Sequence, residues 1–547
     1  MTRQSVDQSL NYIDISQSPD FVTFTGNRIE CRLEKLDEFV FVGHGAEIHM
    51  QSTSNGKTVE LHALGMAAER IHLRWSGKFD PCMMMLGDHW ERGYGDLQWM
   101  QIAAERIMPW YFLAYDGQFT HGYGVKTGVS GLCFWQADPS GISLTIDVRA
   151  GGDGVLLGDR ILKAAEIVFR QGIADETPFA AGHEFCKMMC DNPRLPDHPV
   201  YGGNNWYHSY GNSSHEDILN DTQLLVSHCS NTGNPPYMVV DCGWTVNSLV
   251  SAGYSPVAGG PWDKGNIKFP DMPGLAASIR SMGAHPGIWI RPLAVGADFD
   301  SSLLLPNCRY QNIDAAEPIM DPTIPENLAK VADDIRRLRE WGYTLIKHDF
   351  STYDISGNWG FGMGSQITKP GWSFADRSHT TAEVILNLYR TIRSAAGDAV
   401  IIGCNTIGHL GAGLFEIQRT GDDTSGTEWD RTRKMGVNTL AFRMPQHEAF
   451  FLADADCVGL RKDIPWELNA QWLDLLARSG TPLFVSASPD AVGPEQSAAL
   501  RRAFEQASSH QPAGEPIDWL TNLTPCKWKF GDTTVNYDWQ EHNKEKV

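Results

Sequence analysis

The first third of the chain alternates apolar and polar residues in short runs. These runs cover residues 21–36, 39–52, 70–79, 131–151 and 164–172, and Gly, Asn, Asp or Pro turns separate them. A period of two residues is typical of strands that bury one face, and the helical period is absent here. We therefore predict an N-terminal antiparallel β-sandwich domain over residues 1–195.

The pattern changes in the segment 176–199, which begins as a helix and ends in a Pro-rich link. Beyond Pro196, short apolar runs alternate with helical segments up to about residue 510. We expect strands at 200–207, 235–244, 285–293, 343–350, 398–405, 414–423, 449–457 and 481–488. We expect helices at 213–230, 272–283, 325–342, 380–397 and 465–480, several of which end in a Gly that suits a C-cap.

Eight strand-then-helix units over roughly 310 residues match a (β/α)₈ TIM barrel in number and size. A doubly wound sheet is the alternative, but no G-x-G-x-x-G opens a helix after any of the strands. The expected class is α/β, with a catalytic barrel at 196–512 and a short C-terminal β segment at 513–547.

Composition narrows the range of partners. The net charge of −21 and the pI of about 5.3 argue against nucleic acid and against an anionic membrane surface. No run of 18 apolar residues and no secretory signal is visible, so we expect a cytoplasmic protein whose eleven cysteines are reduced. The 18 Trp and 53 Gly residues are typical of carbohydrate-active proteins.

Polar residues follow the apolar part of seven of the eight expected strands. In chain order they are Asn205 and Trp206; Asp241, Cys242 and Trp244; Trp289 and Arg291; Lys347 and Asp349; Cys404 and Asn405; Arg419, Asp422 and Asp423; Asp454 and Asp456. The active site of a TIM barrel lies at the carboxyl ends of its strands. The set therefore predicts one site, although we interpret Asp454 and Asp456 as a helix cap or loop.

Glycoside cleavage suits this set because it needs two carboxyl groups on opposite sides of a sugar ring. Lys347 lies on the same strand face as Asp349 and favours its carboxylate form, whereas the adjacent acids Asp422 and Asp423 repel each other, which raises one pKa. The alternatives are a structural Lys347–Asp349 ion pair and an N-cap role for the acid doublet. A metal site of Asp241, His348, Asp349 and Asp423 is a third alternative.

Five segments in order resemble the melibiase-type glycoside hydrolases, the clan of α-galactosidases and α-N-acetylgalactosaminidases, in the branch with a large N-terminal β-domain. The segments are "GGNNWYHSYG", "YMVVDCGW", "GIWIRP", "YTLIKHDF" and "RTGDD". The resemblance implies that Asp349 is the nucleophile and Asp423 the general acid/base. It implies substrate contacts from Trp206, Asp241, Trp244, Lys347, Cys404, Asn405 and Arg419, to which we add Cys242, Trp289, Arg291, His348 and Asp422.

Three residues depart from the clan pattern. Cys242 stands where a second acid is usual, Arg291 where an acid is common, and His348 where an aromatic residue separates the Lys and Asp. These departures predict an altered sugar preference. The loop 88–99, "DHWERGYGDLQW", resembles a segment that reaches an active site in this branch, often that of a neighbouring subunit; the alternative is a surface loop folded onto the sandwich.

The resulting hypothesis is a retaining, exo-acting α-glycosidase with an α-linked carbohydrate substrate and no cofactor or metal. Retention predicts a carboxyl separation of roughly 5–6 Å. A transglycosylase of the same family and a non-catalytic sugar-binding protein remain as alternatives. A homo-oligomer is left open.

Overall fold

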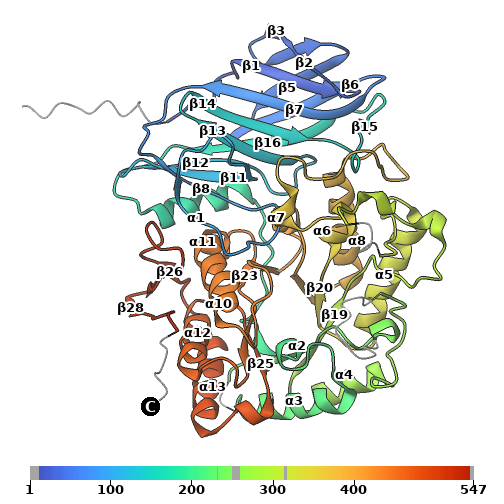
Figure 1. Ribbon diagram of the computed structural model, residues 1–547, viewed down its shortest axis with the longest axis vertical. Coiled ribbons are helices and arrows are strands. Elements are labelled where there is room, and N and C mark those ends of the chain that lie inside the picture. The colour runs from blue at the N-terminus through green and yellow to red at the C-terminus, as the bar shows by residue number, and fades with distance from the viewer. Residues whose placement is uncertain (1–11, 231, 249–258, 313–316, 542–547) are drawn as a thin grey trace, which may run out of the picture.

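The computed structural model describes residues 12–230, 232–248, 259–312 and 317–541. A β-rich N-terminal part lies above a parallel sheet that is surrounded by helices (Figure 1). Within the described residues, no helix is both long enough and apolar enough to cross a membrane.

Two antiparallel sheets form the N-terminal part, as the alternation of apolar and polar residues predicts. The first sheet has the order β10-β13-β14-β7-β1-β2, with β15 beside β7. Its strands are β1 (Phe21–Gly26), β2 (Ile29–Arg32), β7 (Ala67–Ser76), β10 (Met108–Pro109), β13 (Leu132–Asp138), β14 (Gly141–Asp147) and β15 (Val155–Leu156). In β1 the buried positions alternate, with Val22 and Phe24 fully buried, so this strand turns one face to the core.

The second sheet has the order β3-β4-β5-β6-β16-β12-β11-β8-β9. Its strands are β3 (Glu34–Asp37), β4 (Val40–Gly43), β5 (Ala46–Ser52), β6 (Gly56–Ala63), β8 (Met84–Gly87), β9 (Met100–Gln101), β11 (Tyr111–Tyr115), β12 (Thr120–Val125) and β16 (Leu162–Arg170). The helix α1 (Pro178–Met189) follows, with Thr177 as its N-cap, and packs Phe185 against Gly122 of β12. This helix leads the chain into the parallel sheet.

The parallel sheet is curled and has the order β23-β22-β21-β20-β19-β18-β17-β25-β24. Its strands are β17 (Tyr201–Asn204), β18 (Tyr237–Val240), β19 (His285–Ile290), β20 (Leu345–His348), β21 (Val400–Gly403), β22 (Ile417–Arg419), β23 (Leu452–Asp454), β24 (Cys457–Leu460) and β25 (Leu483–Ala487). Each expected strand is present, but the seventh is divided in two. Only Ala455 and Asp456 separate β23 from β24, and Asp456 has a φ of 73°.

Helices cover the outer side of this sheet (Figure 1). The α-helices are α2 (Trp206–Ser209), α3 (His215–Ser227), α4 (Met272–Ser281), α5 (Pro325–Glu340), α6 (Ser351–Ser356), α7 (Gly360–Met363), α8 (Thr381–Ala396), α9 (Gly408–Gly411), α10 (Trp429–Thr432), α11 (Thr439–Arg443), α12 (Trp466–Arg478) and α13 (Pro494–Ala507). On α5, Val331, Ile335 and Leu338 are fully buried, since a spacing of three or four residues places them on one face.

The strands of the parallel sheet bury both of their faces. On β18, Met238 and Val240 pack in the main core, whereas Tyr237 and Val239 belong to a second apolar cluster with Leu345 and other strand residues. Two buried faces explain why these strands are nearly continuous apolar runs in the sequence. The polar residues therefore begin only where each strand ends.

A three-stranded antiparallel sheet closes the chain, with the order β26-β27-β28. Its strands are β26 (Glu515–Pro516), β27 (Lys527–Phe530) and β28 (Thr533–Asn536). The sequence predicts two or three strands in this region, and the structure has three.

Candidate active site

The three ionisable residues Lys347, His348 and Asp349, at the end of β20 and directly after it, point in different directions. The Lys347 ammonium lies 2.7 Å from Asp241 Oδ2, and this ion pair, against the effect of burial, raises the pKa of Lys347. The His348 ring faces the opposite way and makes edge contacts with Tyr389 and Phe415. The predicted substrate contact of His348 is therefore wrong, because neighbouring residues of a strand point to opposite faces.

Three hydrogen bonds fix the carboxyl group of Asp349. The Trp289 indole donates to Oδ2 at 3.0 Å, and the backbone N–H groups of Phe350 and Asn405 donate to Oδ1 at 2.8 and 3.0 Å. Burial alone would raise the pKa of Asp349, but the positive charges of Lys347 and then Arg92 prevail and lower it. A carboxylate that stays ionised and held in one orientation can act as a nucleophile.

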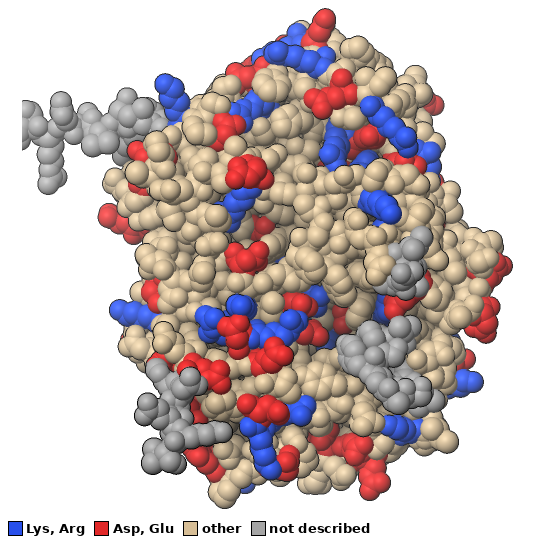
Figure 2. All heavy atoms as spheres, in the orientation of Figure 1, with Lys and Arg blue, Asp and Glu red and all other residues tan. Residues whose placement is uncertain are grey.

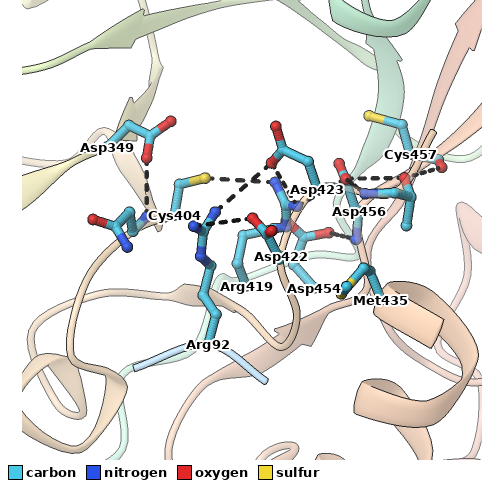
Figure 3. Close-up of polar contacts among 12 residues, drawn as sticks. Arg92, Asp349, Cys404, Arg419, Asp422, Asp423, Met435, Asp454, Asp456 and Cys457 are labelled. Atoms are coloured by element: carbon cyan, nitrogen blue, oxygen red, sulfur yellow. Dashed lines mark hydrogen bonds and ion pairs between the residues drawn. The ribbon is translucent and has the colours of Figure 1, made fainter. Parts of the chain in front are cut away.

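Asp423, after β22, has the opposite electrostatic setting. Burial and the neighbouring acids Asp456 and Asp422 raise its pKa, although Arg419 acts against them. Arg419 Nη2 lies 3.2 Å from Asp423 and 2.8 Å from Asp456. Figure 3 shows the carboxyl groups of Asp349 and Asp423 on either side of the Cys404 thiol, and the Asp423 side chain is 39% exposed. A partly exposed carboxyl with a raised pKa suits a proton donor.

The loop 88–99 of the N-terminal part reaches this cluster within the same chain. Arg92 Nη2 lies 3.0 Å from Asp422, and Nη1 lies 3.7 Å from Asp423 (Figure 3). The backbone of Gly93 pairs with that of Gly421: its N–H donates to Thr420 O at 2.8 Å, and its carbonyl accepts from Asp422 N–H at 2.9 Å. The alternative of a loop folded only onto the sandwich is thereby excluded, although Trp90 does pack against Trp110 there.

Glu91, on the same loop, is a second buried ionisable residue that the sequence did not assign to the site. Its carboxyl accepts from Asn405 Nδ2, from the Tyr94 hydroxyl and from Gly360 N–H, the last at 2.9 Å. Burial raises its pKa against the nearby charge of Arg92. The density of polar residues in a Gly-broken loop was the only sequence signal for Glu91 and Arg92.

Asp456 lies in the two-residue break between β23 and β24, as its interpretation as a loop residue expects, and it also pairs with Arg419 of the candidate site. Besides Arg419, it accepts from the Tyr207 hydroxyl and from Thr424, whose backbone N–H lies at 2.9 Å. Asp454, two residues earlier, is buried as well, and burial raises its pKa to about 6. Sequence reasoning listed this pair among the strand ends but set it apart as a cap or loop, because nothing local distinguishes an acid at a strand break from a helix cap.

The structure brings together most of the residues proposed from the strand ends. Asp241 accepts from Asn204 Nδ2 at 2.6 Å as well as from Lys347. Burial, and then the charges of Asp241 and Asp349, raise the pKa of the Cys242 thiol. Arg419 Nη1 lies 3.5 Å from Cys404 Sγ. Trp206 is partly buried and makes an edge contact with Tyr210.

Two further predicted contacts are corrected by the structure. Trp244 is fully buried: its indole donates to Trp289 O at 3.0 Å and its ring packs between Trp262 and Trp341, behind the strand ends. Arg291 is also buried, and its guanidinium forms ion pairs with Asp354 and Glu317. Its charge is already neutralised by two acids, so Arg291 is not placed to make the predicted substrate contact.

The metal alternative also fails on geometry. Lys347 occupies Asp241, and His348 points away from Asp349, so the four residues of that alternative do not converge. Among the described residues, no cluster of three or more His, Cys, Asp or Glu side chains is arranged to hold a metal ion.

No family model matches the sequence. Among solved structures, the α-galactosidase TtGalA from Thermus thermophilus, in complex with p-nitrophenyl α-D-galactopyranoside, superposes with a TM-score of 0.59 at 16% identity, over 94% of this chain and 99% of that one. The GH36 α-galactosidase AgaA from Geobacillus stearothermophilus, in complex with raffinose, gives 0.57 at 13% identity, over 93% and 76%. A GH31 sulfoquinovosidase from E. rectale gives 0.57 at 12% identity, over 96% and 88%.

These superpositions cover nearly the whole chain, so they define its class of fold: it is the fold shared by GH36 α-galactosidases and a GH31 sulfoquinovosidase. Within that class, several of the similar structures are GH36 α-galactosidases. The α-galactosidase-type architecture named from the sequence motifs is therefore confirmed as a fold.

Proposed function

We propose that the protein is a retaining, exo-acting α-glycosidase of the α-galactosidase type, with an α-linked glycoside as its substrate. The observation that carries the proposal is the contrast between two carboxyl groups, one after β20 and one after β22, with β21 between these strands. Lys347 and Arg92 keep Asp349 ionised, whereas burial and two adjacent acids favour the protonated form of Asp423. A nucleophile and a proton donor with divided pKa values are what double displacement at a sugar requires.

In the first step, a carboxylate oxygen of Asp349 bonds to the anomeric carbon while the bond to the leaving oxygen breaks. Asp423 gives its proton to that leaving oxygen. In the second step, the Asp423 carboxylate takes a proton from water, and the oxygen of that water bonds to the anomeric carbon. The ester bond to Asp349 breaks, so the sugar leaves with its original anomeric configuration.

We assign the sugar contacts to the side chains that surround the two carboxyl groups. These are Lys347, Asp241, Arg419, Asp422, Cys404, Asn405, Cys242, Trp206 and Trp289, to which we add Glu91 and Arg92 from the N-terminal part. Cys242 has a small, weakly polar side chain at a position where the clan that the sequence motifs resemble carries an acid. A sugar hydroxyl that would donate to that acid has no carboxylate acceptor at Cys242, which supports a changed sugar preference.

We further propose that the parallel sheet closes as an eight-stranded barrel. The halves β23 and β24 stand at the two ends of the sheet order, and two residues separate them in the chain. One broken strand thus borders both β22 and β25. The proposed division of the chain is 1–195, 196–512 and 513–547.

A panel of aryl α-glycosides tests the function: galactoside, N-acetylgalactosaminide, arabinopyranoside and glucoside. We expect turnover of at least one of them, with the α-anomer as the first product in a proton NMR time course. A β-anomer as first product would contradict retention, and a ligand-bound structure with carboxyl groups about 9 Å apart would indicate inversion. Product analysis with and without an acceptor sugar separates hydrolysis from transglycosylation.

Failure to turn over any member of the panel, combined with measurable sugar binding, would favour the non-catalytic alternative. Covalent labelling separates the two cases directly. A galacto-configured epoxide that alkylates the nucleophile of retaining α-glycosidases should attach once per protein chain, so that the protein mass rises by that of one inhibitor molecule. Peptide mapping should locate the label at Asp349.

A further inference from the structure

Phe350, which directly follows Asp349, has a left-handed backbone conformation with φ of 64° and ψ of −7°. Residues other than Gly rarely adopt this backbone conformation. The strand β20 ends at His348 and α6 begins at Ser351, so the chain turns from strand to helix across Asp349 and Phe350 alone. Strained backbone of this kind persists only where its surroundings hold it in place.

The turn at Phe350 determines where the Asp349 carboxyl group lies. The Phe350 N–H donates to Asp349 Oδ1 at 2.8 Å, which ties the side chain to the backbone of the next residue. Trp289 holds the other oxygen at 3.0 Å. A change of the backbone at Phe350 would move this N–H away and leave Oδ1 with the Asn405 N–H as its donor.

Arg291 is the residue that packs on the Phe350 ring. Its guanidinium carbon lies 4.5 Å from the ring centroid, within the range of a cation–π contact. The rings of Trp289 and Trp359 also lie beside Phe350, with centroids at 6.4 and 5.7 Å. Phe350 is therefore partly buried among aromatic rings and next to a buried cation.

Arg291 is itself fixed by two acids. Its Nε lies 3.1 Å from both carboxyl oxygens of Asp354 and its Nη2 lies 2.6 Å from one of them, and Glu317 forms a second ion pair. Asp354 belongs to α6, the helix that starts directly after Phe350. Arg291, directly after β19, thus contacts both Phe350 at the turn and Asp354 in the helix that follows it.

We infer that Arg291 is a positioning residue for Asp349, which acts by holding Phe350 in its left-handed conformation. The inference rests on the proposed function only in naming Asp349 as the nucleophile. Arginine suits this role because its planar guanidinium can stack on a ring and form a bidentate ion pair at the same time, whereas the ammonium group of lysine cannot. It also gives Arg291 a task other than the sugar contact predicted from the sequence.

Two substitutions of Phe350 separate its conformation from its ring. Phe350→Gly removes the ring but adopts the left-handed conformation freely, whereas Phe350→Val keeps an apolar side chain and resists that conformation. We expect crystal structures to show the Asp349 carboxyl in place in the Gly variant and displaced in the Val variant. The rate of labelling by the galacto-configured epoxide should stay within about tenfold of wild type for Gly and fall by about 100-fold for Val.

A double-mutant cycle then tests the role of Arg291. The paired change Arg291→Gln with Asp354→Asn removes a cation and an acid together, so that no buried charge of that pair is left alone. It should slow labelling when residue 350 is Phe and cause little further loss in the Phe350→Gly background. The acid limb of the pH profile should also move to higher pH in the Val variant, because Asp349 loses a hydrogen bond to its ionised form.

An unchanged Asp349 position in the Val variant would overturn the inference, and so would equal losses from the Arg291 change in both backgrounds. If the paired variant does not fold, Arg291→Lys replaces it, because lysine keeps the charge beside Asp354 and Glu317 but cannot stack on the ring as a plane; slower labelling when residue 350 is Phe supports the inference, and unchanged labelling overturns it. Wild-type protein that shows neither labelling nor turnover would refute the proposed function instead, and crystal structures of the Phe350 and Arg291 variants would still decide whether these two residues position Asp349.

Discussion

Arg92 Nη2 lies 3.0 Å from Asp422 Oδ1, so a side chain from the N-terminal part of the chain is ion-paired with the acid doublet at the end of β22. Arg92 is buried, and its charge also helps to keep Asp349 ionised. The N-terminal part is therefore a component of the candidate site in addition to packing against it. On the face shown in Figure 2, acidic and basic side chains are interspersed, in keeping with paired charges at the surface as well.

The first prediction concerns the proposed nucleophile. Asp349→Asn should lower kcat for an aryl α-galactoside by a factor on the order of 10⁴, because an amide cannot form the glycosyl ester, and should leave sugar binding measurable by calorimetry. Asp398→Asn is the matched control, since Asp398 is an exposed acid paired with Arg339. Near-normal turnover by the Asp349 variant would refute its assignment.

The proposed acid/base makes a different prediction. Asp423→Asn should slow substrates with poor leaving groups by about 10²–10⁴-fold, but slow the first step much less for a nitrophenyl leaving group, which needs no proton. The glycosyl-enzyme should then accumulate, because no base activates water. Added azide should restore turnover and yield the α-glycosyl azide, detectable by mass spectrometry and NMR. An equal loss for all leaving groups, without azide rescue, would indicate that another residue supplies the proton.

A third prediction follows from the charge of Arg92. The active form has Asp349 ionised and Asp423 protonated, and Arg92 lowers the pKa of both carboxyl groups. Arg92→Gln removes a nearby positive charge, so both limbs of the profile of kcat/KM against pH should move to higher pH, by about one unit. Arg92→Lys, which retains the charge, should move them less.

The more exposed Arg431 provides the control for this measurement. It pairs with Asp422 at 2.9 Å from the outer side, and its charge does not figure among the main influences on Asp423. Arg431→Gln should therefore shift the alkaline limb less than Arg92→Gln. Identical shifts in the two variants would mean that Arg92 has no particular influence on the proposed acid/base.

The fourth prediction concerns stability at the contact between the N-terminal part and the parallel sheet. His409 stacks on Trp110 with ring centroids 4.8 Å apart, and its Nε2–H lies 2.9 Å from Val125 O. Burial lowers the pKa of His409 to about 4. Between about pH 6.5 and 4, His409 is therefore protonated in the unfolded chain but neutral in the folded chain. The free energy of unfolding falls as the pH is lowered through this range.

The contribution of this one histidine should be about 2 kcal/mol between pH 7 and pH 5. His409→Gln keeps a donor for Val125 and removes the titration, so its free energy of unfolding should depend less on pH than that of wild type. Urea unfolding at the two pH values measures the difference. A pH dependence equal to that of wild type would show that His409 does not titrate on unfolding.

The residues Lys347 to Asp349 show how far sequence reasoning reached and where it stopped. The alternation of a strand is local, so it correctly placed Lys347 and Asp349 on one face, and it could have excluded His348 by the same rule. The partner of Lys347 is Asp241, from a different strand, and not Asp349 as in the structural alternative. That pairing depends on the register between strands, which no single segment specifies.

The sequence by itself determined the alternation of strands and helices after Pro196, the polar residues that follow most of those strands, and the two carboxyl groups of Asp349 and Asp423. These features are local, because periodicity and turn residues act within a few positions. Only the tertiary structure decided that Glu91 and Arg92 lie in the candidate site, more than 300 residues away from Asp422 in the sequence. It also decided that ion pairs with Asp354 and Glu317 neutralise Arg291. Long-range contacts like these follow from packing between distant segments, and packing leaves no periodic signal in the chain.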